Sequence, residues 1–214
     1  MSRIIATTVY TLDELTTDAR ERARCWYREH HPDSNWYENV YEDFREVCDI
    51  LGIDLRQRVI RLSSGRFMEE PCIWFSGFCS QDDGACFEGH WRWQSAAPRK
   101  IREYAPQDHE LHRIADALQA VQKRNFWQLQ TEVSHRGRYC HPYSMVITVT
   151  RGSPVGQEMT ADAEAAVCEA LRDLAFWLYR QLENEHDWLI SDSAVDEAIL
   201  INEYTFTETG QRFC

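Results

Sequence analysis

The chain has 214 residues, of which 43% are hydrophobic and 12% aromatic, and it carries a formal net charge of −12. This composition excludes a disordered chain, and the length fits one compact domain with a sizeable core. No run approaches the roughly 18 apolar residues of a membrane-spanning helix, and the first residues lack the apolar stretch of a signal peptide. We therefore expect a cytoplasmic protein that makes no contact with membranes.

The eight cysteines are scattered through the chain rather than grouped in a disulfide framework. Without an export signal, we expect reduced thiols, because disulfides rarely persist in the cytoplasm.

The negative charge is concentrated near the C-terminus. Residues 160–208 contain 12 acidic side chains against two arginines, a net charge of −10. Such a field disfavours direct contact with nucleic acid and favours a basic or nucleic-acid-binding protein as partner. A solvated helical surface is the plain alternative.

The N-terminal quarter predicts one strand and two helices. Residues 4–10 are rich in β-branched side chains and predict a strand. Thr11 and Glu14 have the spacing of a capping box, so we expect a helix from there to about residue 29. Apolar residues at helical spacing predict a second helix over residues 35–51.

The next segment predicts strands. Residues 53–62, 72–78 and 85–93 have strand-like composition, and Asp83-Gly84 between the last two is typical of a hairpin turn.

The remaining segments mix both kinds of element. We expect helices over residues 108–125 and 160–185 and a short one from about residue 191, and strands over 126–133, 143–150 and 203–207. The whole pattern predicts a single α+β domain, residues 1–214, with a largely antiparallel sheet packed by amphipathic helices. Residues 152–156 are the best candidate for a flexible joint before the acidic helical C-terminal part.

Residues 72–90 are the first place to look for a functional site. In one interpretation, Asp83-Gly84 is an ordinary turn; in another, Gln81, Asp82 and Asp83 form a recognition loop for a partner. A third is a zinc site, because cysteine and histidine are the residue types that bind zinc. Its candidate ligands are Cys72, Cys79, Cys86 and His90. The seven-residue spacing of these cysteines argues against zinc, and we expect neither a metal nor a cofactor.

Other sequence signals for catalysis are weak. Cys140 and His141 are neighbours, and neighbours on a strand point to opposite faces, so we do not expect them to act together. The sequence contains no glycine-rich phosphate loop, zinc-protease helix or hydrolase nucleophile motif. An enzyme is therefore the less favoured interpretation.

Several segments together resemble a family of phage and prophage proteins labelled as the antitoxin of a toxin–antitoxin stability system. The resemblance rests on residues 10–15, 40–43, 75–78, 84–89, 178–183 and 206–212. Cys79 and Asp82-Asp83 depart from the family pattern, which has an aromatic residue and Gly-Asp there. The resemblance implies a phage-encoded protein that acts in the host cytoplasm, and it brings no catalytic residues with it.

Our leading prediction is a protein-binding inhibitor, an antitoxin or an anti-CRISPR-like counter-defence protein, that occludes its partner through an acidic surface. The residues predicted to bind the partner are the acidic ones of the C-terminal helices: Glu183, Glu185, Asp187, Asp192, Asp196 and Glu197. The alternatives are a metal-dependent hydrolase or nucleotide-modifying enzyme with its site at residues 72–90, and a phage structural or assembly protein.

Overall fold

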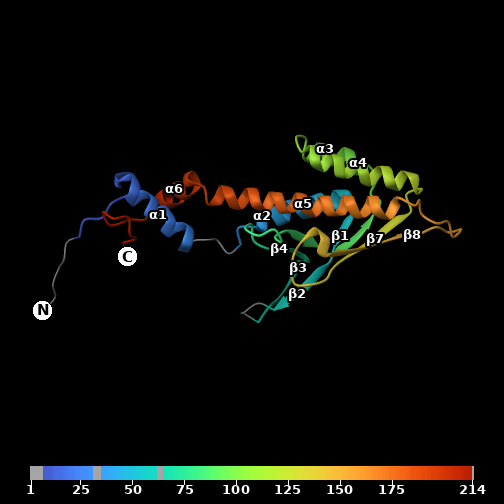
Figure 1. The fold of residues 1–214 in the computed structure, drawn as a ribbon, viewed down its shortest axis with the longest axis horizontal. Helices are drawn as coiled ribbons and strands as arrows, with labels where there is room; N and C mark the ends of the chain where they lie inside the picture. The colour runs from blue at the N-terminus through green and yellow to red at the C-terminus, as the bar shows by residue number, and fades with distance from the viewer. Residues whose placement is uncertain (1–6, 31–34, 62–64, 214) are drawn as a thin grey trace. The chain divides into compact units, whose positions relative to one another are not determined.

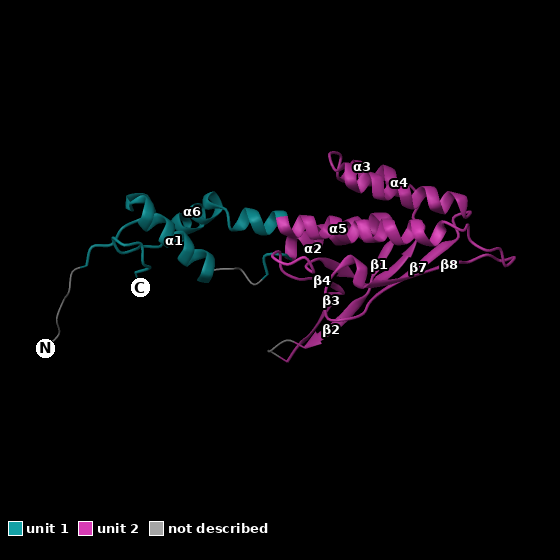
Figure 2. Ribbon diagram, viewed as in Figure 1, with its two compact units in different colours: residues 1–37, 184–214 teal, residues 38–183 magenta. Residues whose placement is uncertain are grey.

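The computed structural model describes residues 7–30, 35–61 and 65–213, and the chain forms two compact units. Unit 1 consists of residues 1–37 and 184–214, and unit 2 of residues 38–183 (Figure 2). The predicted α+β class with a largely antiparallel sheet is confirmed. None of the described helices is long and apolar enough to cross a membrane.

Unit 2 is built on a four-stranded antiparallel sheet (Figure 1). Its strands in spatial order are β1 (Ile53–Leu55), β6 (Gly89–Arg92), β7 (Leu129–His135) and β8 (Met145–Arg151). Burial alternates along β6, β7 and β8, which is the pattern of a sheet with one face in the core and one face exposed. The exposed face is polar.

Two short hairpins complete the strands of unit 2: β2 (Gln57–Arg61) with β3 (Phe67–Pro71), and β4 (Ile73–Phe75) with β5 (Ala85–Phe87). The predicted strand 53–62 is divided at Arg56, whose N–H donates to the carbonyl of Glu88 and whose carbonyl accepts from Cys72 N–H. β3 was not predicted, because its exposed, charged sequence lacks alternation.

The predicted hairpin with Asp83-Gly84 in its connection is present, but its first strand ends earlier than residue 78. β4 and β5 do pair, but a nine-residue loop, residues 76–84, joins them. The carboxylate of Asp83 accepts hydrogen bonds from the backbone N–H groups of Cys79 (2.9 Å) and Ser80 (2.7 Å). Asp83 therefore closes a wide loop through its side chain rather than forming a tight turn.

The helices of unit 2 bury apolar stripes. They are α2 (Glu38–Leu51), α3 (Ala97–Tyr104), α4 (His109–Arg124) and α5 (Ala163–Leu189), whose last turns belong to unit 1. In the core, the ring of Phe44 from α2 lies 5.5 Å from that of Phe87 in β5 and 6.4 Å from that of Trp177 in α5. α3, which has Pro98 in its first turn, was not predicted. The proposed joint at residues 152–156 lies between β8 and α5 inside unit 2.

The connection from α4 to β7 explains why the strand begins later than predicted. Phe126 and Trp127 have φ angles of 55° and 63°, a left-handed conformation that a strand cannot contain. The buried Gln122 side chain donates to the carbonyl of Leu129 and accepts from its N–H, at 2.8 and 3.1 Å. The side chain of Gln122 thus takes the place of a backbone partner at the start of β7.

Unit 1 packs α1 (Thr17–His30) with α6 (Asp192–Ile201) and the short 3-10 helix η1 (Leu12–Glu14). Its buried cluster consists of small and aliphatic side chains and one aromatic ring: Leu12, Leu15, Ala19, Ala23, Val195, Ile199 and Phe206. The capping box is present, since Glu14 accepts from Thr11 N–H at 2.8 Å, but it caps η1, and the main helix begins at Thr17.

The two predicted terminal strands are not formed as predicted. Residues 1–6 lie outside the described residues, and residues 7–9 are not in a strand. Only an isolated antiparallel bridge joins Tyr10 to Phe206, and residues 203–207 otherwise form no strand. Phe206 also forms an isolated bridge with Arg212, and residue 203 has a φ of 52°, which is not a strand conformation.

Phe44→Ala should destabilise unit 2 by about 3–5 kcal/mol, because it opens a cavity between α2, β5 and α5. Phe67→Ala is the matched control: this ring on β3 is 73% exposed, and its loss should change stability by less than about 0.5 kcal/mol. Urea unfolding of the full chain measures both. Equal midpoints for the two variants would contradict the assigned core.

Candidate functional site

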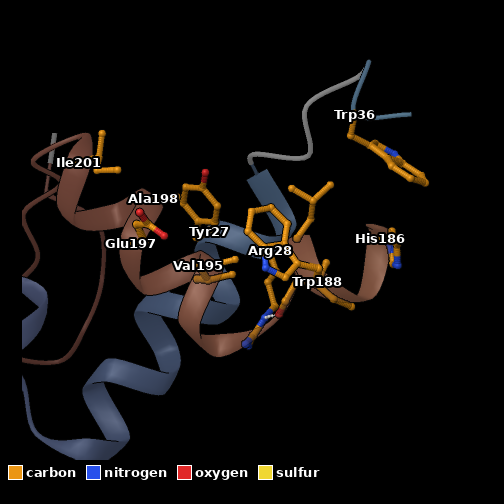
Figure 3. A pocket seen from close by; sticks show the side chains of 12 residues that line it. Tyr27, Arg28, Trp36, His186, Trp188, Val195, Glu197, Ala198 and Ile201 are labelled. Carbon is orange, nitrogen blue, oxygen red and sulfur yellow. Dashed lines mark hydrogen bonds between the residues drawn. The ribbon is translucent and has the colours of Figure 1, made fainter. Parts of the chain in front are cut away.

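Unit 1 contains a hollow of about 420 Å³ between its helices (Figure 3). It is lined by Tyr27 and Arg28 of α1, by the end of α5, and by α6, with Trp36 and His186 at one end. The remaining lining residues are aliphatic, aromatic or acidic: Trp188, Leu189, Ile190, Ala194, Val195, Glu197, Ala198 and Ile201.

The spacing of side chains along α6 creates the hollow. Ala194, Ala198 and Ile201 recur at helical spacing on one face, so they lie side by side. The two alanines leave space, while Ile201 (72% exposed) and Trp188 (58% exposed) rise beside it. Large apolar side chains gathered around an open hollow are typical of an interaction site rather than of ordinary surface. We call this set of lining residues the unit 1 groove.

Unit 1 is acidic, and one of its carboxylates lines the unit 1 groove. Unit 1 contains thirteen acidic and six basic residues, a net charge of −7 out of −12 for the chain. Glu197 lines the groove, and Glu185 and Asp187 stand on the last turns of α5 beside His186 and Trp188. No described lysine or arginine forms an ion pair with these three carboxylates. Asp187 lies 3.8 Å from a ring nitrogen of His186, and among the described residues Glu185 and Glu197 carry no ion pair.

Two of the acidic residues predicted to bind a partner are instead engaged within unit 1. Asp196 receives two hydrogen bonds from the guanidinium of Arg24, at 2.6 and 2.7 Å. Asp192 accepts from Arg24 at 2.7 Å and from Arg28 at 2.5 Å. The hydrogen bonds to Asp196 raise the pKa of Arg24, which favours its charged form. These ion pairs fasten α6 to α1.

Arg28 also shapes the unit 1 groove directly. Its Nε donates to the carbonyl of Ile190 at 2.9 Å, which fixes the connection between α5 and α6 where the groove wall stands. Glu183, the sixth predicted acid, belongs to unit 2 and is no part of this groove. The acidic character of the helices was predicted from the sequence, but the groove was not. Two large apolar residues within an acidic segment, Trp188 and Ile201, were the sequence feature that could have indicated it.

The predicted recognition loop divides in a similar way. Gln81 and Asp82 are exposed, whereas Asp83 is committed to the loop itself. The hydrogen bond from the backbone of Ser80, with a second from Cys79, lowers the pKa of Asp83 below its usual range. Only Gln81 and Asp82 remain free to contact a partner there.

The four zinc ligands considered from the sequence do not converge. Cys79 is exposed in the 76–84 loop, and His90 points to the exposed polar face of the sheet because it alternates with the buried Trp91. Cys72 precedes β4 and is buried there. Within the described residues, Cys86 lies with a different pair, His135 and Cys140.

A family model described as a domain of unknown function, DUF8835, matches residues 36–192. The match covers all of unit 2, and it leaves α1 and nearly all of α6 outside. No curated protein and no solved structure matches the chain.

Asp196→Ala should weaken the attachment of α6 to α1 by about 1.5–3 kcal/mol, the range for hydrogen bonds to charged groups. Glu197→Ala, one residue further along, removes a carboxylate that forms no ion pair with the described residues. It should change the stability of this attachment by less than about 0.5 kcal/mol. Hydrogen-exchange protection of the α6 amides reports this local stability. Equal losses in the two variants would show that the ion pair with Arg24 does not hold the helix.

Proposed function

The chain belongs to the DUF8835 family, and we propose that it is a protein-binding module whose unit 1 groove receives a basic, apolar segment of a partner protein. The observation that carries the proposal is an open, largely apolar hollow that the carboxylate of Glu197 helps to line, in a unit of net charge −7. α1 and nearly all of α6 lie outside the family match, so seven of the twelve lining residues do as well.

The form of the unit 1 groove favours a protein segment over a small metabolite. Its apolar side chains include Trp188 and Ile201, which stay largely exposed, whereas small-molecule pockets enclose most of their ligand. A helix or extended segment could place one or two apolar side chains over Ala194 and Ala198.

The charge around the unit 1 groove specifies the partner further. Glu185, Asp187 and Glu197 would attract lysine or arginine residues that flank the apolar anchors. A second copy of the chain would bring two units of net charge −7 together, which disfavours self-association through this surface. The occupant we propose is therefore a different, basic protein.

A basic segment of this kind is common in proteins that bind nucleic acid. A basic segment bound in the unit 1 groove could not contact the phosphates of nucleic acid, which is one physical route to inhibition. The antitoxin or counter-defence role suggested by the sequence resemblance is a specific form of this proposal. It is supported by the excess of negative charge and by the carboxylates at the groove.

The proposal is tested with a defined probe, a labelled amphipathic peptide of leucine and lysine, whose binding to the full chain is followed by fluorescence anisotropy. We expect salt-sensitive binding that Ala198→Trp abolishes by filling the unit 1 groove. Trp188→Ala should weaken the binding roughly thirtyfold, the effect of losing a contact worth about 2 kcal/mol.

Two peptides and two variants serve as controls. A peptide with glutamate in place of lysine, or serine in place of leucine, should bind at least about tenfold more weakly, since each lacks one of the two required chemistries. Phe67→Ala and Glu208→Gln, which alter an exposed ring and a carboxylate away from the unit 1 groove, should bind like the unaltered chain. Binding that survives Ala198→Trp, or that is equally tight for the glutamate peptide, rejects the proposal.

A further inference from the structure

Three metal-binding side chains from separate parts of unit 2 meet at one place. A sulfur of Cys86, a ring nitrogen of His135 and a sulfur of Cys140 all lie within 4.8 Å of one another. Cys86 is in β5, His135 ends β7, and Cys140 is in the segment that leads from β7 to β8. We propose that these three residues bind a zinc ion.

The strand β5 places Cys86 on the correct side. All three residues of β5 are buried, so both faces of this strand are covered. Successive side chains of a strand point to opposite faces. Since Phe87 packs on Phe44 in the helical core, Cys86 points away from that core, toward the segment that contains Cys140.

Close packing holds the Cys140 segment against the β4–β5 hairpin. A Cβ atom on Gly84 would lie only 3.1 Å from the carbonyl oxygen of Cys140 and 3.0 Å from the ring of His141. The hydroxyl of Ser76 donates to the same Cys140 carbonyl at 3.4 Å. A larger residue at position 84 would be crowded against the backbone of Cys140 and His141, so glycine favours this close packing.

The ring of His135 is oriented by its neighbours. The hydroxyl of Ser144 lies 3.0 Å from Nδ1 of His135 and donates its proton to the carbonyl of His141 at 2.7 Å. In the tautomer in which Nδ1 carries the proton, His135 donates to this oxygen and its other ring nitrogen keeps a lone pair for a metal ion. A hydrogen bond of this kind is the usual support of a metal-ligating histidine. The ring of Trp74 lies 5.5 Å away on another side.

The ligand types select the metal. Two thiolates and an imidazole suit zinc, whereas calcium and magnesium require oxygen ligands. Two thiolates also neutralise the charge of a divalent ion, which offsets the cost of placing the ion in a largely buried position.

The described residues supply three ligands, and His135 and Cys140 are each partly exposed. A tetrahedral zinc ion would then take its fourth ligand from solvent, as zinc ions that act on substrates do. The inference is independent of the unit 1 groove, because the two sites belong to different units of the chain.

The test is the metal content and cobalt spectrum of the full chain, prepared with a reductant. We expect about one equivalent of zinc, which Co²⁺ replaces with a thiolate-to-cobalt charge-transfer band and the strong visible bands of tetrahedral cobalt. Cys140→Ala and His135→Ala should each lower zinc retention at least about tenfold, and Ser144→Ala should lower zinc affinity by about ten- to a hundredfold.

Cys79→Ala and His90→Ala are the matched controls, because both residues have the same ligand chemistry and both lie away from the cluster. They should retain zinc fully, and circular dichroism identifies any variant that fails to fold. A chain that takes up neither zinc nor cobalt overturns the proposal. Zinc that is retained equally well by the Cys140→Ala and His135→Ala variants also overturns it. A disulfide between Cys86 and Cys140, found in metal-free protein purified without a reductant, does the same.

Discussion

The packing of Phe44 against Phe87 and Trp177 is the contact on which unit 2 depends. It joins the β4–β5 hairpin to helices that come from both ends of the unit, so it sets the face that each residue of β5 presents. With Phe87 directed into the helical core, Cys86 must point the other way, where the segment between β7 and β8 covers it. The proposed zinc site is thus a consequence of how the core is packed.

Unit 1 is smaller than unit 2 and has fewer residues with which to build a core. Small side chains such as Ala19 and Ala23 let α1 approach its neighbours closely, and the ion pairs of Arg24 with Asp192 and Asp196 fasten α6 from its polar side. This arrangement leaves the alanine face of α6 uncovered. The carboxylates of the C-terminal region therefore divide into those that hold the unit together and those that border the unit 1 groove.

Local sequence signals predicted the elements whose stability is local. The helix at α4, capped by Asp108, was predicted within one residue at each end, and the capping box at Thr11 and Glu14 was identified correctly. The helix expected to follow that box begins later, because Thr11 caps a single 3-10 turn. Sequence patterns alone did not predict the wide loop closed by Asp83, since its form depends on which backbone groups one carboxylate reaches.

The candidate sites were harder to predict because each depends on contacts between distant segments. Cys86, His135 and Cys140 are 49 and 5 residues apart in the sequence, which matches no common spacing of zinc ligands. Cys140 and His141 were expected to lie on a strand, but the chain is irregular there. The acidic character of the C-terminal helices was visible in the sequence. Which carboxylates are neutralised by Arg24 and Arg28 was not, because that depends on the packing of α1 against α6.

The central claim, that a protein partner binds at the unit 1 groove, is tested most directly by site-specific photo-crosslinking in cell extract. Benzoylphenylalanine is placed at Ile201 beside the groove or at Thr150 on the exposed polar face of the sheet. The account predicts one discrete protein adduct from position 201, suppressed by the leucine–lysine peptide, and none from position 150. An adduct from position 150 alone, or one from position 201 that the peptide leaves unchanged, would contradict it.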